Sequence, residues 1–84
     1  MNASTLARID ALWTAGNNAG HGFAAPGETV EDAVAAYEAD GGIVLHRAQN
    51  TSEVSVVRKG QFLYVVGDSA GGWCVRLPAT ALDA

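Results

Sequence analysis

The stretch that decides the fold is Phe62-Leu63-Tyr64-Val65-Val66, because its side chains are apolar at every position. A strand of this composition has no face that is suited to water. It belongs to a series of four short β-prone runs, separated by turn-forming residues, that fill the second half of the chain: 43–46, 53–57, 62–66 and 73–77. Runs spaced this closely are typical of an antiparallel meander.

A first helix is expected before these runs. It begins at Asn2 or Ser4, either of which can cap exposed backbone amides, and it ends at Ala15, just before Gly16. The segment 17–27 is rich in Gly and Asn and is expected to form a long loop.

A second helix is expected to begin after Thr29, an N-cap residue type, with Asp32 in a capping-box position. It ends at Gly41 and Gly42, one of which is expected to adopt a left-handed conformation. These elements predict an α+β fold, in which two N-terminal helices pack on one face of a three- to four-stranded antiparallel sheet in the order ααββββ. The length predicts a single domain over residues 1–84.

The turns decide which side chains share a face. A two-residue turn at 59–60 places Val57 opposite Phe62, and the following loop is expected to place Val66 opposite Trp73. One face then carries Val57, Phe62, Tyr64, Val66, Trp73, Val75 and Leu77, and the other carries Val54, Val56, Leu63, Val65 and Cys74. A bulge at the first turn would shift the pairing by one residue and reassign whole strands.

Both faces of this sheet carry apolar side chains, and the helices are expected to cover only one. Leaving four or five such side chains in water would forgo roughly 1.5 to 3 kcal/mol for each of them. We therefore expect Leu63 and Val65 to contact a partner, or a second copy of the chain in a homodimer through the sheet. The alternative is that loops and residues 78–84 cover this face. Phe23, which follows the glycine-rich stretch 20–22, is a further candidate for partner binding, whereas Trp73 is interpreted as a core residue.

Charge is distributed unevenly along the chain. The formal net charge is −4, and no Lys or Arg lies between Arg8 and Arg47. The second helix and its ends carry a set of acidic residues: Glu28, Glu31, Asp32, Glu38 and Asp40. We expect this set to bind a protein or ribonucleoprotein with a basic surface. The alternative is a solvated helix face. Direct binding to nucleic acid is not expected, because it requires clustered cations. Without an apolar run of membrane-spanning length or a secretory signal, the expected location is the cytoplasm.

Few side chains are candidates for catalysis or metal binding. His21, Cys74 and Asp68 could form a nucleophile, base and orienting group, but no local signature supports an enzyme or ligand-binding module of this kind. A zinc site that combined His21, His46 and Cys74 with a carboxylate would match no known ligand spacing. Neither an enzyme activity, a metal nor a cofactor is therefore expected.

Residues 68–77 resemble the tryptophan-bearing strand of bacterial SH3-like domains, over about ten residues only. In size, acidity and lack of a catalytic motif the chain is also similar to small phage inhibitors such as anti-CRISPR proteins, and to bacterial immunity proteins. This second likeness is one of type and transfers no residues. It implies a small acidic protein-binding module that inhibits or adapts a macromolecular partner, the alternatives being an immunity protein or a structural assembly subunit.

Overall fold

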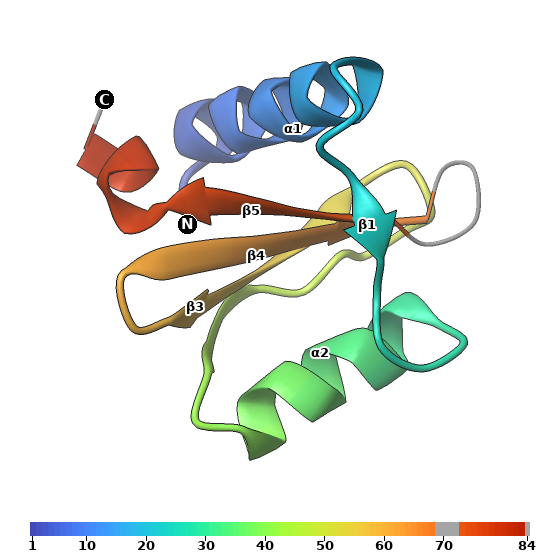
Figure 1. Ribbon diagram of the computed structural model, residues 1–84. Coiled ribbons are helices and arrows are strands. Elements are labelled where there is room, and N and C mark those ends of the chain that lie inside the picture. The colour runs from blue at the N-terminus through green and yellow to red at the C-terminus, as the bar shows by residue number, and fades with distance from the viewer. Residues whose placement is uncertain (69–72, 84) are drawn as a thin grey trace.

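The computed structural model describes residues 1–68 and 73–83, which form two helices packed against one antiparallel sheet (Figure 1). The sheet has five strands in the order β1-β5-β4-β3-β2. The elements are α1 (Ala3–Asn18), β1 (Phe23–Ala24), α2 (Val30–Ala39), β2 (Ile43–His46), β3 (Val54–Lys59), β4 (Phe62–Gly67), β5 (Trp73–Pro78) and the 3-10 helix η1 (Ala79–Asp83). The predicted α+β class is confirmed. The fifth strand, β1, lies within the segment that was expected to be a loop.

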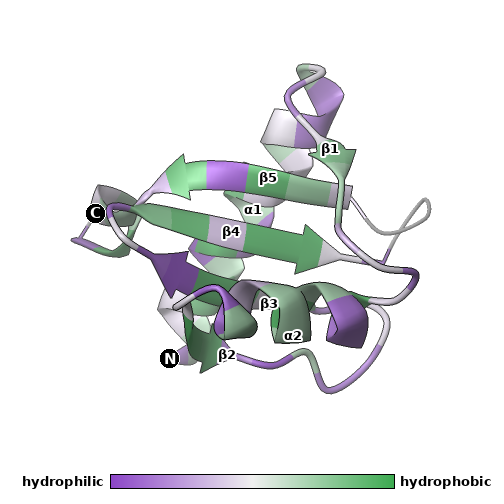
Figure 2. Cartoon of the chain, turned by 60° about the horizontal axis from the view of Figure 1, so that its bottom comes forward, coloured by the Kyte–Doolittle hydropathy of each residue, from purple (hydrophilic) through white to green (hydrophobic). Residues whose placement is uncertain are grey.

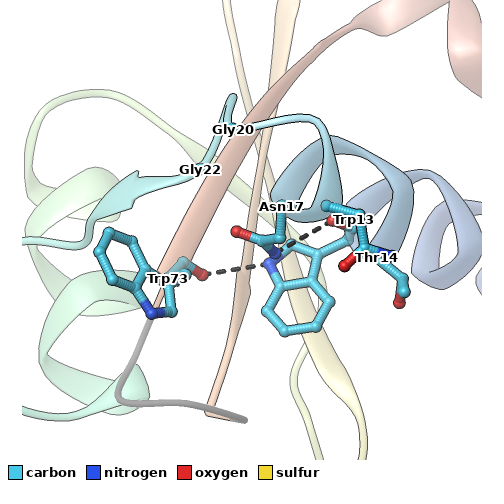
Figure 3. Close-up of a pocket in the computed structure, with 7 residues that line it drawn as sticks. Trp13, Thr14, Asn17, Gly20, Gly22 and Trp73 are labelled. Atoms are coloured by element: carbon cyan, nitrogen blue, oxygen red, sulfur yellow. Dashed lines mark hydrogen bonds between the residues drawn. The ribbon is translucent and has the colours of Figure 1, made fainter.

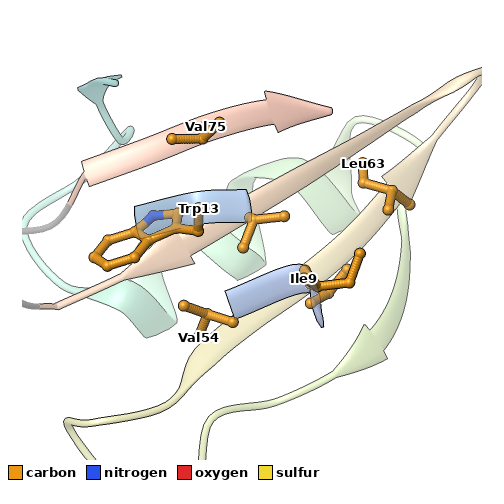
Figure 4. Close-up of a cluster of buried hydrophobic side chains, with 7 residues drawn as sticks. Ile9, Trp13, Val54, Leu63 and Val75 are labelled. Carbon is orange, nitrogen blue, oxygen red and sulfur yellow. The ribbon is translucent and has the colours of Figure 1, made fainter. Parts of the chain in front are cut away.

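The two helices lie on opposite faces of the sheet, with α1 on one side and α2 on the other (Figure 1). The expectation that both helices cover the same face is therefore wrong. On the α1 face, Ile9 and Trp13 pack into the larger core cluster with Val54, Leu63 and Val75 (Figure 4). On the α2 face, a smaller cluster gathers around Ala33, Val66 and Cys74. The apolar side chains on both faces of β4 are thus buried largely by the chain itself.

The ends of α1 are set by local hydrogen bonds. The Asn2 side chain accepts a hydrogen bond from the Thr5 backbone N–H at 2.8 Å, which confirms Asn2 as the N-cap. The helix continues past Gly16, where it was expected to end. A Cβ atom at Gly16 would lie 2.8 Å from Val75, so this glycine permits close packing of α1 on β5. The helix instead ends before Gly20, whose φ of 81° is the left-handed conformation of a Schellman-type cap.

The start of α2 follows the predicted capping pattern. The Thr29 side chain accepts a hydrogen bond from the Asp32 backbone N–H at 3.0 Å, and the Asp32 carboxylate accepts one from the Glu28 backbone N–H at 3.2 Å. At the other end, Gly41 has a φ of 96°, which confirms the predicted left-handed glycine.

The β3–β4 turn is displaced from its predicted position, but the faces of both strands are as expected. Lys59 pairs with Phe62, so the turn residues are Gly60 and Gln61. The observed pairing differs from the predicted one by an even number of residues, which leaves each side chain on its predicted face. In β5, however, Cys74 rather than Trp73 pairs with Val66. This shift of one residue exchanges the two faces of the whole strand.

The new register places Cys74 and Arg76 on the α2 face, and Trp73, Val75 and Leu77 on the α1 face. Most of the loop predicted between Gly67 and Trp73 lies outside the described residues. Across the described ranges, neither α1 nor α2 has the length and hydropathy that a membrane crossing requires.

Candidate functional site

The acidic residues of α2 are exposed, as a binding surface requires, but three of them interact within the chain. The Asp32 carboxylate accepts a hydrogen bond from the backbone N–H of Glu28, just before the helix. Glu38 lies 3.3 Å from the Arg47 guanidinium, and Asp40 forms an ion pair with Lys59, whose pKa is raised by this hydrogen bond. Two acidic residues near the start of the helix form no ion pair with another described residue: Glu28 and Glu31. The acidic face is therefore smaller than the sequence suggests.

Leu63 and Val65 are not on a free surface. Both side chains are 0% exposed in the core cluster beneath α1. The prediction that they contact a partner required an uncovered sheet face, and α1 covers that face.

Cys74 is a buried thiol rather than an accessible nucleophile. Burial raises its pKa above the ordinary value, and the Tyr37 hydroxyl donates a hydrogen bond to its sulfur at 3.5 Å. His21 and Asp68 are both exposed, and no hydrogen bond joins either of them to Cys74 in the described part of the chain. No hydrogen bond therefore connects His21, Cys74 and Asp68 as a catalytic set in the described part of the chain. Among residues 1–68 and 73–83, no group of three His, Cys, Asp or Glu side chains is placed to hold a metal ion.

A strip of the α2 face is left open because α2 packs mainly on β2, β3 and β4 (Figure 2). Phe23 on β1 and Phe62 on β4 are each 40% exposed. Phe23 pairs with Cys74 and Phe62 with Pro78, and the exposed Arg76 lies between these two positions on β5. Tyr64, directly opposite Arg76, stacks on Tyr37 of α2 with ring centroids 4.6 Å apart. We name Phe23, Phe62, Tyr64 and Arg76 the aromatic strip.

Arg76 differs from the other cationic side chains of this protein. Its guanidinium carbon lies 4.4 Å from the centre of the Phe62 ring. In the described residues it makes no hydrogen bond or ion pair, whereas the other four basic side chains each donate to a carboxylate or a carbonyl: Arg8, Arg47, Arg58 and Lys59. The guanidinium is thus held over an aromatic face and keeps its N–H donors available.

A hollow of about 490 Å³ lies on the other side of the sheet, at the end of α1. Figure 3 shows the two indoles on either side of the bond from Trp13 Nε1 to the Trp73 carbonyl oxygen, at 3.1 Å. The Asn17 amide donates to the Trp13 carbonyl oxygen at 3.0 Å. We name this hollow the tryptophan pocket, and its lining consists of Trp13, Thr14, Asn17, Asn18, Gly20, Gly22 and Trp73.

Neither surface was predicted in full. Phe23 was identified, but Arg76 and Phe62 were not, and Trp73 was assigned to the core although it is 39% exposed. The assignments of Trp73 and Arg76 depend on the register of β5. The alternation of Trp73, Val75 and Leu77 with Cys74 and Arg76 was visible in the sequence, but it does not say which set faces which helix.

Comparisons with protein-family models, with curated proteins and with solved structures found no match. The aromatic strip and the tryptophan pocket are therefore the features from which a function can be proposed. They lie on opposite faces of the sheet, near the edge formed by β1 and β5.

Proposed function

We propose that this protein is a small, acidic, non-enzymatic binding module that docks an acidic and apolar segment of a larger protein on the aromatic strip. The observation that carries the proposal is the Arg76 guanidinium, which lies over Phe62 without a carboxylate partner among the described residues. Inhibition or adaptation of that larger partner is the proposed outcome of binding, in line with the likeness to small phage inhibitors and immunity proteins.

Interface hot spots support this choice of surface. They are enriched in aromatic and arginine side chains that lie close together. A guanidinium already held on a ring loses less conformational freedom when it binds, and its planar N–H groups match a carboxylate in two parallel hydrogen bonds. Exposed Phe23 and Phe62 on either side of Arg76 supply apolar area for the side chains next to that carboxylate.

The proposed partner segment has a different charge from the one expected from the sequence. A basic partner would have to rely on Glu28 and Glu31, because Asp32, Glu38 and Asp40 interact within the chain. The aromatic strip instead offers a cation without a paired anion among the described residues. Charge complementarity at this strip therefore favours a carboxylate.

The hydrogen bond that the Cys74 sulfur makes with Tyr37, rather than with His21 or Asp68, supports a binding role over an enzymatic one. Nucleophilic catalysis needs a nucleophile and a base within hydrogen-bond reach of each other. The raised pKa of the buried Cys74 thiol also disfavours the reactive thiolate.

The test is selection from a phage-displayed library of short random peptides on the immobilised protein. We expect the selected peptides to combine Asp or Glu with a neighbouring aromatic or branched aliphatic residue. Arg76→Glu should weaken the binding of a selected peptide by at least about tenfold, because it replaces an attractive charge with a repulsive one. Trp73→Leu, on the opposite face, is the matched control and should bind normally.

Two outcomes would overturn the proposal. Selected peptides that are basic and lose binding in Glu31→Lys would instead assign recognition to the acidic end of α2. Peptides that bind wild type and Arg76→Glu equally would exclude the aromatic strip. A full-length partner captured from cells supports the proposal only if it is lost with Arg76→Glu and if the purified module changes its activity.

A further inference from the structure

We infer that the tryptophan pocket binds an uncharged sugar ring, either as a free saccharide or as part of a glycan. This inference is independent of the proposed protein docking, because the pocket lies on the α1 side of the sheet and the aromatic strip on the α2 side. It follows from the combination of an exposed indole, neutral polar side chains and the electrostatic character of the helix end.

The aromatic wall comes from Trp73 together with Trp13. Trp73 is 39% exposed, whereas Trp13 is only 7% exposed and donates its indole N–H to the Trp73 carbonyl (Figure 3). Trp13 is thus a fixed support, and Trp73 is the side chain that offers area to a ligand. The face of an aromatic ring is electron-rich and attracts the weakly positive C–H groups on the flat side of a pyranose. A volume of about 490 Å³ falls within the range of small-ligand sites and accommodates one or two sugar rings.

Amide and hydroxyl groups supply the polar part of the lining. The Asn17 Nδ2 group is bonded to the Trp13 carbonyl, so the geometry of this amide is fixed. Its Oδ1 atom points toward the Gly22 backbone, since a Cβ atom there would lie only 1.9 Å from it. Asn18 and Thr14 add further donors and acceptors. Such groups match the hydroxyls of a sugar, each of which can donate and accept.

Other ligand classes fit less well. No charged side chain lines the pocket among the described residues, so neither an anion nor a cation meets an opposite charge. The pocket also lies at the carboxyl end of α1, where the helix dipole disfavours anions. A purely apolar ligand would cover the polar side chains of Thr14 and Asn18 without offering them hydrogen bonds, which is unfavourable.

The test is a titration of the 15N-labelled protein with methyl glucosides, N-acetylglucosamine and cellobiose. We expect saturable shifts of the two indole N–H signals and of the Asn17 side-chain amide, with a Kd on the order of 1 to 10 mM. Saturation-transfer NMR should map the contact to ring C–H groups of the sugar. Comparison of free sugars with a glycan array separates a saccharide ligand from a glycan on a larger molecule.

Matched variants separate the pocket from the rest of the surface. Trp73→Leu should weaken sugar binding by about tenfold or more. Gly22→Ala should also abolish binding, because the new Cβ displaces the Asn17 amide. Phe62→Leu removes a similarly exposed ring from the aromatic strip and should leave sugar binding unchanged.

The inference is wrong if no sugar shifts these signals at about 50 mM, well above the expected Kd. It is also wrong if choline or an apolar ring compound saturates the pocket while every sugar fails. Trp73→Leu should lose sugar binding and keep peptide binding, and Arg76→Glu should show the reverse pattern. These results would show that the two sites are independent.

Discussion

The Tyr37 hydroxyl donates a hydrogen bond to the Cys74 sulfur at 3.5 Å and thereby links α2 to β5. Tyr37 also stacks on Tyr64, so one side chain joins the helix to two adjacent strands. Burial is the main cause that raises the pKa of both Tyr37 and Cys74 above their ordinary values. The anionic forms of the phenol and the thiol are therefore disfavoured on this face of the sheet.

The first prediction is a loss of stability at alkaline pH. Below the ordinary thiol pKa of 9.0, Cys74 is protonated in both the folded and the unfolded chain, and stability is at its full value. Above this pH the unfolded chain releases the proton while the folded chain keeps it, so the free energy of unfolding falls as pH rises. Tyr37 adds the same effect above its ordinary value of 10.0. One such proton contributes a slope of at most about 1.4 kcal/mol per pH unit.

Urea unfolding at several pH values between neutral and strongly alkaline measures this slope. Cys74→Ala should lower stability at neutral pH, because it removes a buried group, but it should make the alkaline slope shallower. Tyr37→Phe is the companion variant and should remove the phenol contribution. Equal slopes in wild type and both variants would contradict the assignment.

A second prediction concerns the contact between Gly67 and Trp13. A Cβ atom at Gly67 would lie 2.5 Å from Cζ2 of the Trp13 indole, well inside van der Waals contact. Gly67→Ala should therefore lower the free energy of unfolding by about 1 to 3 kcal/mol. In a Trp13→Phe background the same substitution should be milder, because the fused ring of the indole is gone. A double-mutant cycle from urea unfolding measures this coupling, and a coupling of zero would show that contact with the indole is not the source of the loss.

Local signals in the sequence predicted the elements well. Thr29 and Asn2 are caps whose function depends only on neighbouring backbone amides, so the sequence around them is sufficient. The four runs of the meander were likewise found within a few residues, because their composition and intervening turns are local properties.

The arrangement of helices around the sheet could not be read in the same way. Val65 and Val66 point to opposite faces of β4 and are both buried. In the sequence, such a pattern is compatible with one helix on each face of the sheet. It is equally compatible with two helices on one face and a partner molecule on the other. The β4–β5 loop also leaves a register ambiguity of one residue, which exchanges Trp73 with Cys74. The faces of Arg76 and Trp73 depend on that register, and this is why the sequence alone identified neither as a surface residue.

A third prediction tests the cap of α2. The Thr29 hydroxyl accepts the Asp32 backbone N–H, so Thr29→Ala should lower the free energy of unfolding by roughly 0.5 to 2 kcal/mol. Thr51→Ala is the matched control, because Thr51 is exposed in a loop outside the helix. Equal stability of the two variants in urea unfolding would mean that water replaces the threonine cap at no net loss.

The last prediction concerns Arg8, which ties the C-terminal 3-10 helix to α1. Its Nη2 group donates to the carbonyl oxygens of Ala81 at 3.0 Å and Leu82 at 3.3 Å, while its buried Nε atom has no hydrogen-bond partner in the described structure. Arg8→Met keeps most of the apolar stem but removes the donors, so η1 should detach at a loss of only about 1 kcal/mol. Backbone 15N relaxation should show increased nanosecond motion in Ala79–Asp83, with Arg47→Met, which removes only an exposed contact to Glu38, as the control. An η1 that stays equally rigid in Arg8→Met would show that apolar packing of Ala81 and Leu82 on the core is sufficient to hold it.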